Sequence, residues 1–165
     1  MTINPIRIAL TLMLVATPIA ARAQDRPAPV VEFAAGWVGF ADDGIVSETM
    51  AGGAFRWYPL RRVAIGPEIV YISGDNHSHL VLTGNLTFDL LANRAVTPFL
   101  VVGGGLFQTH ESFPAGDFTS NEGAFTLGGG VRVAAGDRVL IGFDTRIGWE
   151  THLRVNATVG IRLGQ

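Results

Sequence analysis

Apolar and polar residues alternate strictly over the last segment of the chain. Its apolar members are Leu153, Val155, Ala157, Val159, Ile161 and Leu163, and the residues between them are Arg154, Asn156, Thr158, Gly160 and Arg162. A period of two places every apolar side chain on one face of a β-strand, whereas a helix would scatter them around its axis. The segment is therefore predicted to be a strand with one apolar and one polar face.

The same alternation recurs along the chain and predicts eight strands. The expected ranges are 29–40, 46–58, 62–72, 79–91, 96–108, 123–134, 138–149 and 152–163. Each range is about as long as a tilted strand that crosses a bilayer, which takes roughly 9–11 residues. The connections after the second, fourth and sixth strands are short, and those after the first, third and fifth are longer or polar, with the longest predicted over residues 109–122. Short turns on one rim and longer loops on the other are typical of outer-membrane barrels.

The first 23 residues are set apart from this pattern. Arg7 precedes an apolar run that begins at Ile8, and the run ends at the small-residue pattern Ala21-Arg22-Ala23. These features predict a secretory signal peptide over residues 1–23, cleaved after Ala23, and a single barrel domain over residues 24–165. The run is too short for a comfortable transmembrane helix. An uncleaved N-terminal anchor is the alternative.

Composition excludes several classes of protein. The chain has no cysteine, so disulfides and thiolate metal sites are excluded, and its formal net charge of −2 does not indicate a nucleic-acid partner. All 12 basic residues are arginine. A water-facing surface usually carries lysine. The absence of lysine therefore favours an exterior that does not face water.

Alternation alone does not say which face points outward. A soluble periplasmic barrel that binds an apolar ligand would place the apolar face inside, and a membrane barrel would place it outside. Mid-strand charges and many glycines on the polar face favour the membrane arrangement, as do aromatic residues near the predicted strand ends. These aromatic residues are Trp37, Trp57, Tyr58, Tyr71, Phe107 and Trp149.

In the membrane arrangement the polar face encloses opposite charges, which must pair when buried. Arginine suits such pairing because its planar fork can hold a carboxylate with two contacts. We therefore predict a charge network that plugs the lumen. Its expected members are Glu32, Arg56, Glu68, Asp89, Arg132, Asp144, Arg146, Glu150 and Arg154. Eight strands leave room only for side chains, so no open pore is expected.

These features resemble the small outer-membrane β-barrel families of the OmpA and OmpX type. The resemblance rests on the N-terminal segment, the eight alternating strands, the glycine triplets at 103–105 and 128–130, and the closing strand 154–163. It implies an all-β, eight-stranded, antiparallel up-and-down transmembrane barrel. The chain departs from the family pattern at its end, where Leu163, Gly164 and Gln165 stand in place of a terminal aromatic residue.

Two weaker patterns suggest chemistry. His77 and His79, with His110 as a further candidate, lie near one predicted rim, and histidine with a carboxylate can bind Zn²⁺ or Cu²⁺. We nevertheless expect no metal site and no cofactor, because histidine is common in polar loops.

The segment His110-Glu111-Ser112 has a His-x-Ser spacing similar to that of outer-membrane lipid A deacylases, with Glu122 or Glu150 as the orienting carboxylate. We place this motif at the start of the long loop, which does not favour an enzyme.

The sequence therefore predicts a non-enzymatic outer-membrane barrel with a structural or surface-interaction role. Its expected partners are outer-membrane lipid, the barrel-assembly machinery and periplasmic chaperones, and we expect a monomer with no nucleic-acid partner. A lipid A-modifying barrel enzyme and a soluble ligand-binding barrel are the alternatives.

Overall fold

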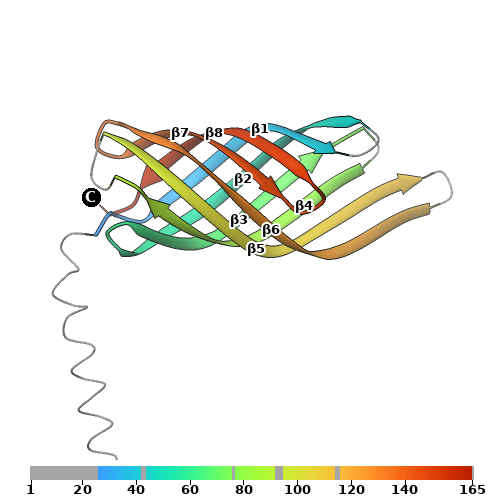
Figure 1. The fold of residues 1–165 in the computed structure, drawn as a ribbon, viewed down its shortest axis with the longest axis horizontal. Coiled ribbons are helices and arrows are strands. Elements are labelled where there is room, and N and C mark those ends of the chain that lie inside the picture. Colours follow the sequence, from blue (N-terminus) through green and yellow to red (C-terminus); the bar gives the residue numbers. More distant parts are fainter. Residues whose placement is uncertain (1–25, 42–43, 76, 92–94, 114–115, 165) are drawn as a thin grey trace, which may run out of the picture.

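The chain folds into a closed barrel of eight antiparallel strands (Figure 1). The computed structural model describes residues 26–41, 44–75, 77–91, 95–113 and 116–164. The strands are β1 (Val30–Ala41), β2 (Ile45–Leu60), β3 (Val63–Ser73), β4 (His77–Asp89), β5 (Val96–Phe113), β6 (Gly116–Ala135), β7 (Val139–Gly148) and β8 (His152–Arg162). Each strand pairs with the next along the chain, and β1 pairs with β8 to close the barrel. The predicted up-and-down barrel is confirmed. The predicted signal peptide lies outside the described residues.

The hairpin of β5 and β6 corrects one prediction. The sequence analysis expected a loop over residues 109–122, but the two strands stay paired as far as Phe113 and Gly116. This extension projects beyond the rest of the barrel (Figure 1). It is held by backbone pairing and by cross-strand bonds such as Gln108 Nε2 to Asn121 Oδ1 at 2.8 Å. A hairpin that extends beyond the barrel buries neither of its faces. Its sequence therefore needs no alternation of apolar and polar residues, and the pattern did not predict these strand ends.

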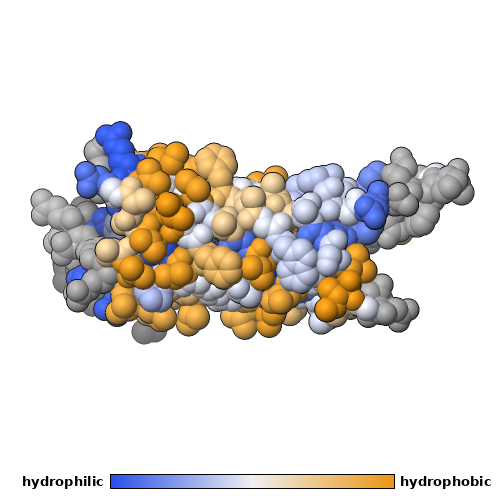
Figure 2. All heavy atoms as spheres, turned by 90° about the horizontal axis from the view of Figure 1, so that it is seen from above, coloured by the Kyte–Doolittle hydropathy of each residue, from blue (hydrophilic) through white to orange (hydrophobic). Residues whose placement is uncertain are grey.

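Apolar side chains cover the outside of the wall, as the alternation predicted. Phe33, Ile69, Leu100 and Phe143 are each about half exposed. Figure 2 shows such side chains gathered over one end and the middle of the barrel, with more polar ones toward the end of the β5–β6 extension. Among the described residues, no helix is long and apolar enough to cross a membrane.

The aromatic residues named from the sequence divide between the two faces of the wall. Trp37, Trp57, Tyr71 and Trp149 are exposed on the outside. Tyr58 and Phe107 instead point inward and are 4% and 1% exposed. Both have the parity of the inner face in their strands, and a position near a strand end is therefore not enough to place an aromatic residue in an outer girdle.

The interior is layered along the barrel axis. We call the end where β1 begins and β8 ends the terminal rim, and the opposite end the loop rim. An apolar group lies at the terminal rim and consists of Val30, Tyr58, Ala64 and Leu140. A second one lies nearer the loop rim and consists of Val38, Phe40, Met50, Val70, Ile72, Val81 and Phe107. Charged residues occupy the strand positions between the two groups.

Candidate functional site: paired charges and a histidine cluster inside the barrel

Glu68 on β3 is the centre of the charged layer. Its Oε2 accepts hydrogen bonds from Arg146 Nη1 at 2.8 Å and Asn85 Nδ2 at 2.9 Å, and its Oε1 accepts one from Arg154 Nη2 at 2.6 Å. Arg146 also holds Asp144 with two contacts, from Nε at 3.2 Å and from Nη2 at 3.1 Å. Side chains from three other strands, β4, β7 and β8, thus meet on the Glu68 carboxylate.

Two further ion pairs lie nearer the terminal rim. Arg56 Nη2 lies 2.5 Å from Glu32 Oε2. Arg132 donates to Asp89 Oδ1 and to the Tyr58 hydroxyl, both at 2.9 Å, and its guanidinium lies 4.0 Å from the centre of the Phe99 ring. Each arginine therefore has a carboxylate partner, and Arg132 has an aromatic face as well.

The charges of this layer balance. Four buried carboxylates, Glu32, Glu68, Asp89 and Asp144, stand against four buried guanidiniums, Arg56, Arg132, Arg146 and Arg154. The Nε atoms of three of these arginines still have no acceptor among the described residues, namely Arg56, Arg132 and Arg154. The layer is neutral as a whole, which lowers the cost of burying it.

Glycines of β6 leave room for these side chains. A Cβ on Gly130 would lie 2.1 Å from the Phe143 carbonyl oxygen and 2.6 Å from Asp144 Cβ. A Cβ on Gly128 would lie 2.2 Å from the Thr145 carbonyl oxygen and 2.8 Å from Arg146 Cγ. The second glycine triplet therefore permits the close approach of β7 and its charged residues.

Glu150 is a correction to the expected network. It lies in the exposed turn between β7 and β8, with φ 57°, and not inside the barrel. Thr151 beside it has φ 43°. This tight turn reverses the chain before His152, so the alternation of β7 does not extend to Glu150.

A second polar group lies inside the barrel at the loop rim. Glu48 on β2 contacts Nε2 of His77, and its Oε2 lies 3.9 Å from Nε2 of His79. His79 Nδ1 is 3.0 Å from the Thr109 hydroxyl. Glu48 and His79 are buried, and the His77 side chain is 31% exposed. We call Glu48, His77 and His79 the histidine cluster; its three ligand atoms lie within 4.8 Å of one another.

Sequence reasoning named the two histidines but missed Glu48. Its signal was present, because Glu48 has the same even parity as Arg56 on the polar face of its strand. His110, the third metal candidate, is not part of the cluster. It lies exposed on β5 and is 3.1 Å from the Thr119 hydroxyl.

His152 lies near the cluster without being one of its ligands. Its Nδ1 donates to the Trp149 carbonyl at 2.5 Å, and its ring lies against Phe40, with centroids 5.3 Å apart. The His79 ring lies against the same phenylalanine at 5.1 Å. Phe40 thus packs against the rings of both His79 and His152.

None of the described contacts joins the histidine of the deacylase-like spacing, His110, to Glu122 or Glu150. His110 bonds Thr119, Glu122 accepts a hydrogen bond from Trp149 Nε1 at 2.9 Å, and Glu150 lies in the β7–β8 turn. Residues 110–112 belong to strand β5 and not to a loop. The interpretation that placed this motif at a loop start was wrong in that respect.

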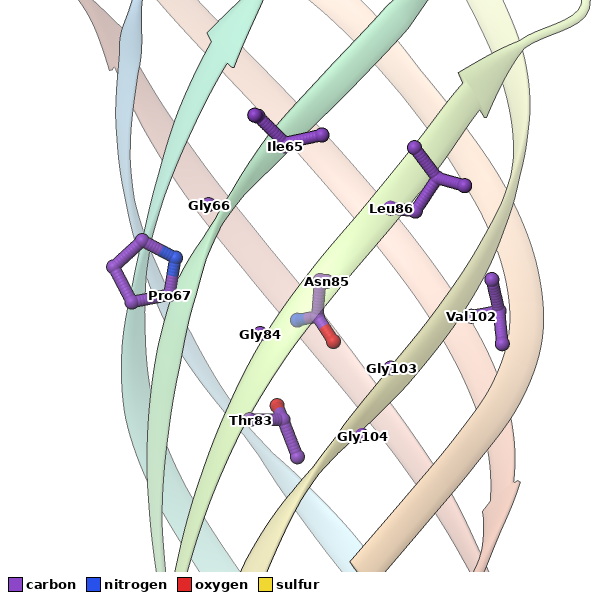
Figure 3. A pocket seen from close by; sticks show the side chains of 10 residues that line it. All are labelled: Ile65, Gly66, Pro67, Thr83, Gly84, Asn85, Leu86, Val102, Gly103 and Gly104. Carbon is purple, nitrogen blue, oxygen red and sulfur yellow. The ribbon is translucent and has the colours of Figure 1, made fainter.

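A shallow groove marks the outer wall over β3, β4 and β5 (Figure 3). Ile65, Leu86 and Val102 stand around it, and Gly84 and Gly104 form part of its base. A Cβ on either glycine would find no atom closer than 3.8 Å. The groove therefore arises because side chains are missing from the apolar surface.

Comparison of the whole fold finds similar solved structures. Neisserial surface protein A has a TM-score of 0.73 at 10% identity, covering 82% of this chain and 97% of that one. The N-terminal β-barrel domain of Pseudomonas aeruginosa OprF has a TM-score of 0.65 at 12% identity, covering 82% and 97%. The attachment invasion locus protein Ail of Yersinia pestis, solved with the heparin analogue sucrose octasulfate, has 0.63 at 10%, covering 83% and 98%.

A designed transmembrane β-barrel is similar as well, with a TM-score of 0.55 at 12% identity, and it covers 84% of this chain and 98% of that one. No protein-family model and no curated protein sequence matches the chain. At such low identity the likeness concerns the fold. The chain therefore has the fold of the small eight-stranded transmembrane barrels.

Proposed function

We propose that this protein is a non-enzymatic barrel of the bacterial outer membrane, with a structural or surface-interaction role and an interior closed to solutes. The observation that carries the proposal is that the barrel wall is apolar on its outer face and charged on its inner face. Apolar side chains such as Phe33 and Leu100 face outward, while the paired charges around Glu68 face inward. Such a wall suits contact with lipid, whereas in water it would expose a large apolar surface.

The packing of the charged layer supports a closed interior. Two internal cavities border Arg146 and Glu68, and each has a volume of about 10 Å³. A single water needs roughly 10–15 Å³. Apolar groups lie on both sides of this layer, and a cavity of about 50 Å³ at the terminal rim borders Asp89 and Arg132. A continuous water path would still have to cross the charged layer and the apolar group nearer the loop rim.

Fractionation and conductance test these two parts separately. We expect the protein to leave the envelope only with detergent and to shift its gel mobility on heating. In planar bilayers we expect no conductance in the range of general porins. Recovery in the periplasm without detergent would contradict the membrane location, and a porin-like conductance would contradict the closed interior alone.

The proposed orientation places the terminal rim in the periplasm and the β5–β6 extension outside the cell. Short turns at the terminal rim and the long hairpin at the other rim support it. The chain has no cysteine, so single cysteines can report on each side. We expect a membrane-impermeant maleimide to label Thr119→Cys in whole cells and to leave Asp137→Cys unlabelled until the cells are broken. The reverse result would invert the orientation.

The β5–β6 extension is the surface we propose for interactions outside the cell. Phe118 is 57% exposed on it, and residues 108–122 contain no lysine or arginine. A sulfated polyanion such as the ligand of the Ail structure would meet no guanidinium or ammonium group there. Lipid, the barrel-assembly machinery and periplasmic chaperones are the other partners that we propose for a monomeric barrel.

A further inference from the structure

Glu48 is a buried carboxylate without an arginine. Every other buried carboxylate among the described residues has a guanidinium beside it, as the ion pairs of Glu32, Glu68, Asp89 and Asp144 show. Glu48 is 3% exposed, and its ion-pair partners among the described residues are the imidazoles of His77 and His79. A buried negative charge needs a compensating positive charge, and a neutral imidazole does not supply one.

One oxygen of Glu48 is also left without a hydrogen bond. Oε2 is buried and has no donor among the described residues, and it lies 3.9 Å from His79 Nε2. A buried acceptor that remains unpaired carries the full cost of its desolvation. At 3.9 Å, Glu48 Oε2 and His79 Nε2 are too far apart for a hydrogen bond.

The geometry points to a metal site: we propose that Glu48, His77 and His79 bind a divalent transition-metal ion of the Zn²⁺ or Cu²⁺ class at the loop rim. Two imidazole nitrogens and one carboxylate oxygen are a ligand set that these ions favour. A tetrahedral ion with bonds of roughly 2.0–2.1 Å places its ligand atoms about 3.4 Å apart. The atoms here lie within 4.8 Å, so small side-chain rotations close the site.

The surroundings of the cluster suit such an ion. The Thr109 hydroxyl lies 3.0 Å from His79 Nδ1, and when Nδ1–H donates to it the Nε2 atom on the side of Glu48 is free to bind a metal. Gly74 lies beside the histidine cluster: a Cβ at this position would stand 2.7 Å from His77 Nε2 and 2.8 Å from Glu48 Oε1. The partly exposed His77 leaves a path from the loop rim, and water can complete the coordination.

The proposal goes beyond the barrel's structural role and requires only that the barrel be folded. The test uses the barrel without a polyhistidine tag, refolded in detergent and freed of metal with a chelator. Calorimetry with Zn²⁺ is expected to show one ion per barrel. Electron paramagnetic resonance of the Cu²⁺ form is expected to show coupling to imidazole nitrogen.

Matched variants distinguish this site from adventitious binding. We expect Glu48→Gln to weaken Zn²⁺ binding at least about tenfold and the double variant His77→Ala/His79→Ala to abolish it. His110→Ala removes an exposed histidine outside the cluster and is expected to leave binding unchanged. Heat-modifiable gel mobility shows that each variant is folded.

A second measurement does not depend on any variant. Zn²⁺ is expected to raise the urea midpoint of the wild-type barrel, since a ligand that binds only the folded state stabilises it, while Mg²⁺ is expected to have no effect. The proposal is overturned if wild-type barrel shows no binding at about 1 mM Zn²⁺, or if Glu48→Gln and the double variant retain wild-type affinity. In either case Glu48 and His77 would form a simple ion pair.

Discussion

The charged layer and the histidine cluster inside the barrel differ in how their buried charges are compensated. In the charged layer, Glu68 accepts hydrogen bonds from Arg146 and Arg154, and the layer as a whole is neutral. In the histidine cluster, Glu48 has no arginine among its described contacts, and its Oε2 has no donor. The first layer balances its charges with the protein's own side chains. The second leaves one buried carboxylate oxygen without a donor, and a bound cation would supply the missing partner.

The largest effect is expected at the centre of the charged layer. Glu68→Gln keeps the shape of the side chain but leaves two buried guanidiniums without their shared carboxylate. Breaking a buried pair in this way costs about 3–5 kcal/mol. Urea unfolding in lipid vesicles, followed by tryptophan fluorescence, measures the loss. Glu122→Gln removes an exposed carboxylate on β6 and is expected to cost less than about 1 kcal/mol. Equal losses in both variants would show that the Glu68 network contributes no special stability.

A smaller effect is expected nearer the terminal rim. Asp89→Asn removes one partner of Arg132, which keeps the Tyr58 hydroxyl and the Phe99 ring. The expected loss in free energy of unfolding is about 2 kcal/mol, as for a hydrogen bond to a charged group. The same unfolding assay measures it. A loss as large as that of Glu68→Gln would mean that the hydroxyl and the ring do not stabilise Arg132.

The inner wall is expected to be less tolerant of added volume than the outer wall. Gly130→Ala forces a Cβ against the β7 backbone and is expected to cost at least about 1 kcal/mol. Gly104→Ala adds the same atom on the outer groove, where the nearest atom would be 3.8 Å away, and is expected to change stability by less than about 0.5 kcal/mol. Unfolding midpoints of the pair test this. If Gly104→Ala proves the more destabilising, the groove is not open.

Among the substitutions of buried carboxylates, the smallest effect on stability is expected at Glu48 in the absence of metal. Glu48→Gln removes a buried charge that has no arginine partner, so unfolding in the presence of a chelator is expected to change by less than about 1 kcal/mol. The contrast with Glu68→Gln is the sharpest measure of the difference between the two layers. A loss near 3 kcal/mol would indicate that His77 is a full cationic partner of Glu48.

Local patterns in the sequence were enough for the barrel and for most members of the charged layer. The even parity of Arg56, or of Glu68 between Ala64 and Val70, is visible without a structure because alternation is a property of a single strand. Leu140, an apolar exception on a polar face, packs inside the terminal rim. The extension of β5 and β6 was missed because a polar ribbon carries no alternating pattern.

The sequence by itself determined the number of strands, their order and the face of most residues within them. Only the tertiary structure decided which charges meet. Glu68 and Arg154 are 86 residues apart, and Glu48 and His77 are 29 residues apart. Their contacts depend on strand register and on closure of the sheet, which bring opposite walls together across a narrow interior. The alternation that places Glu48 inside does not reveal that histidines, and no arginine, surround it there.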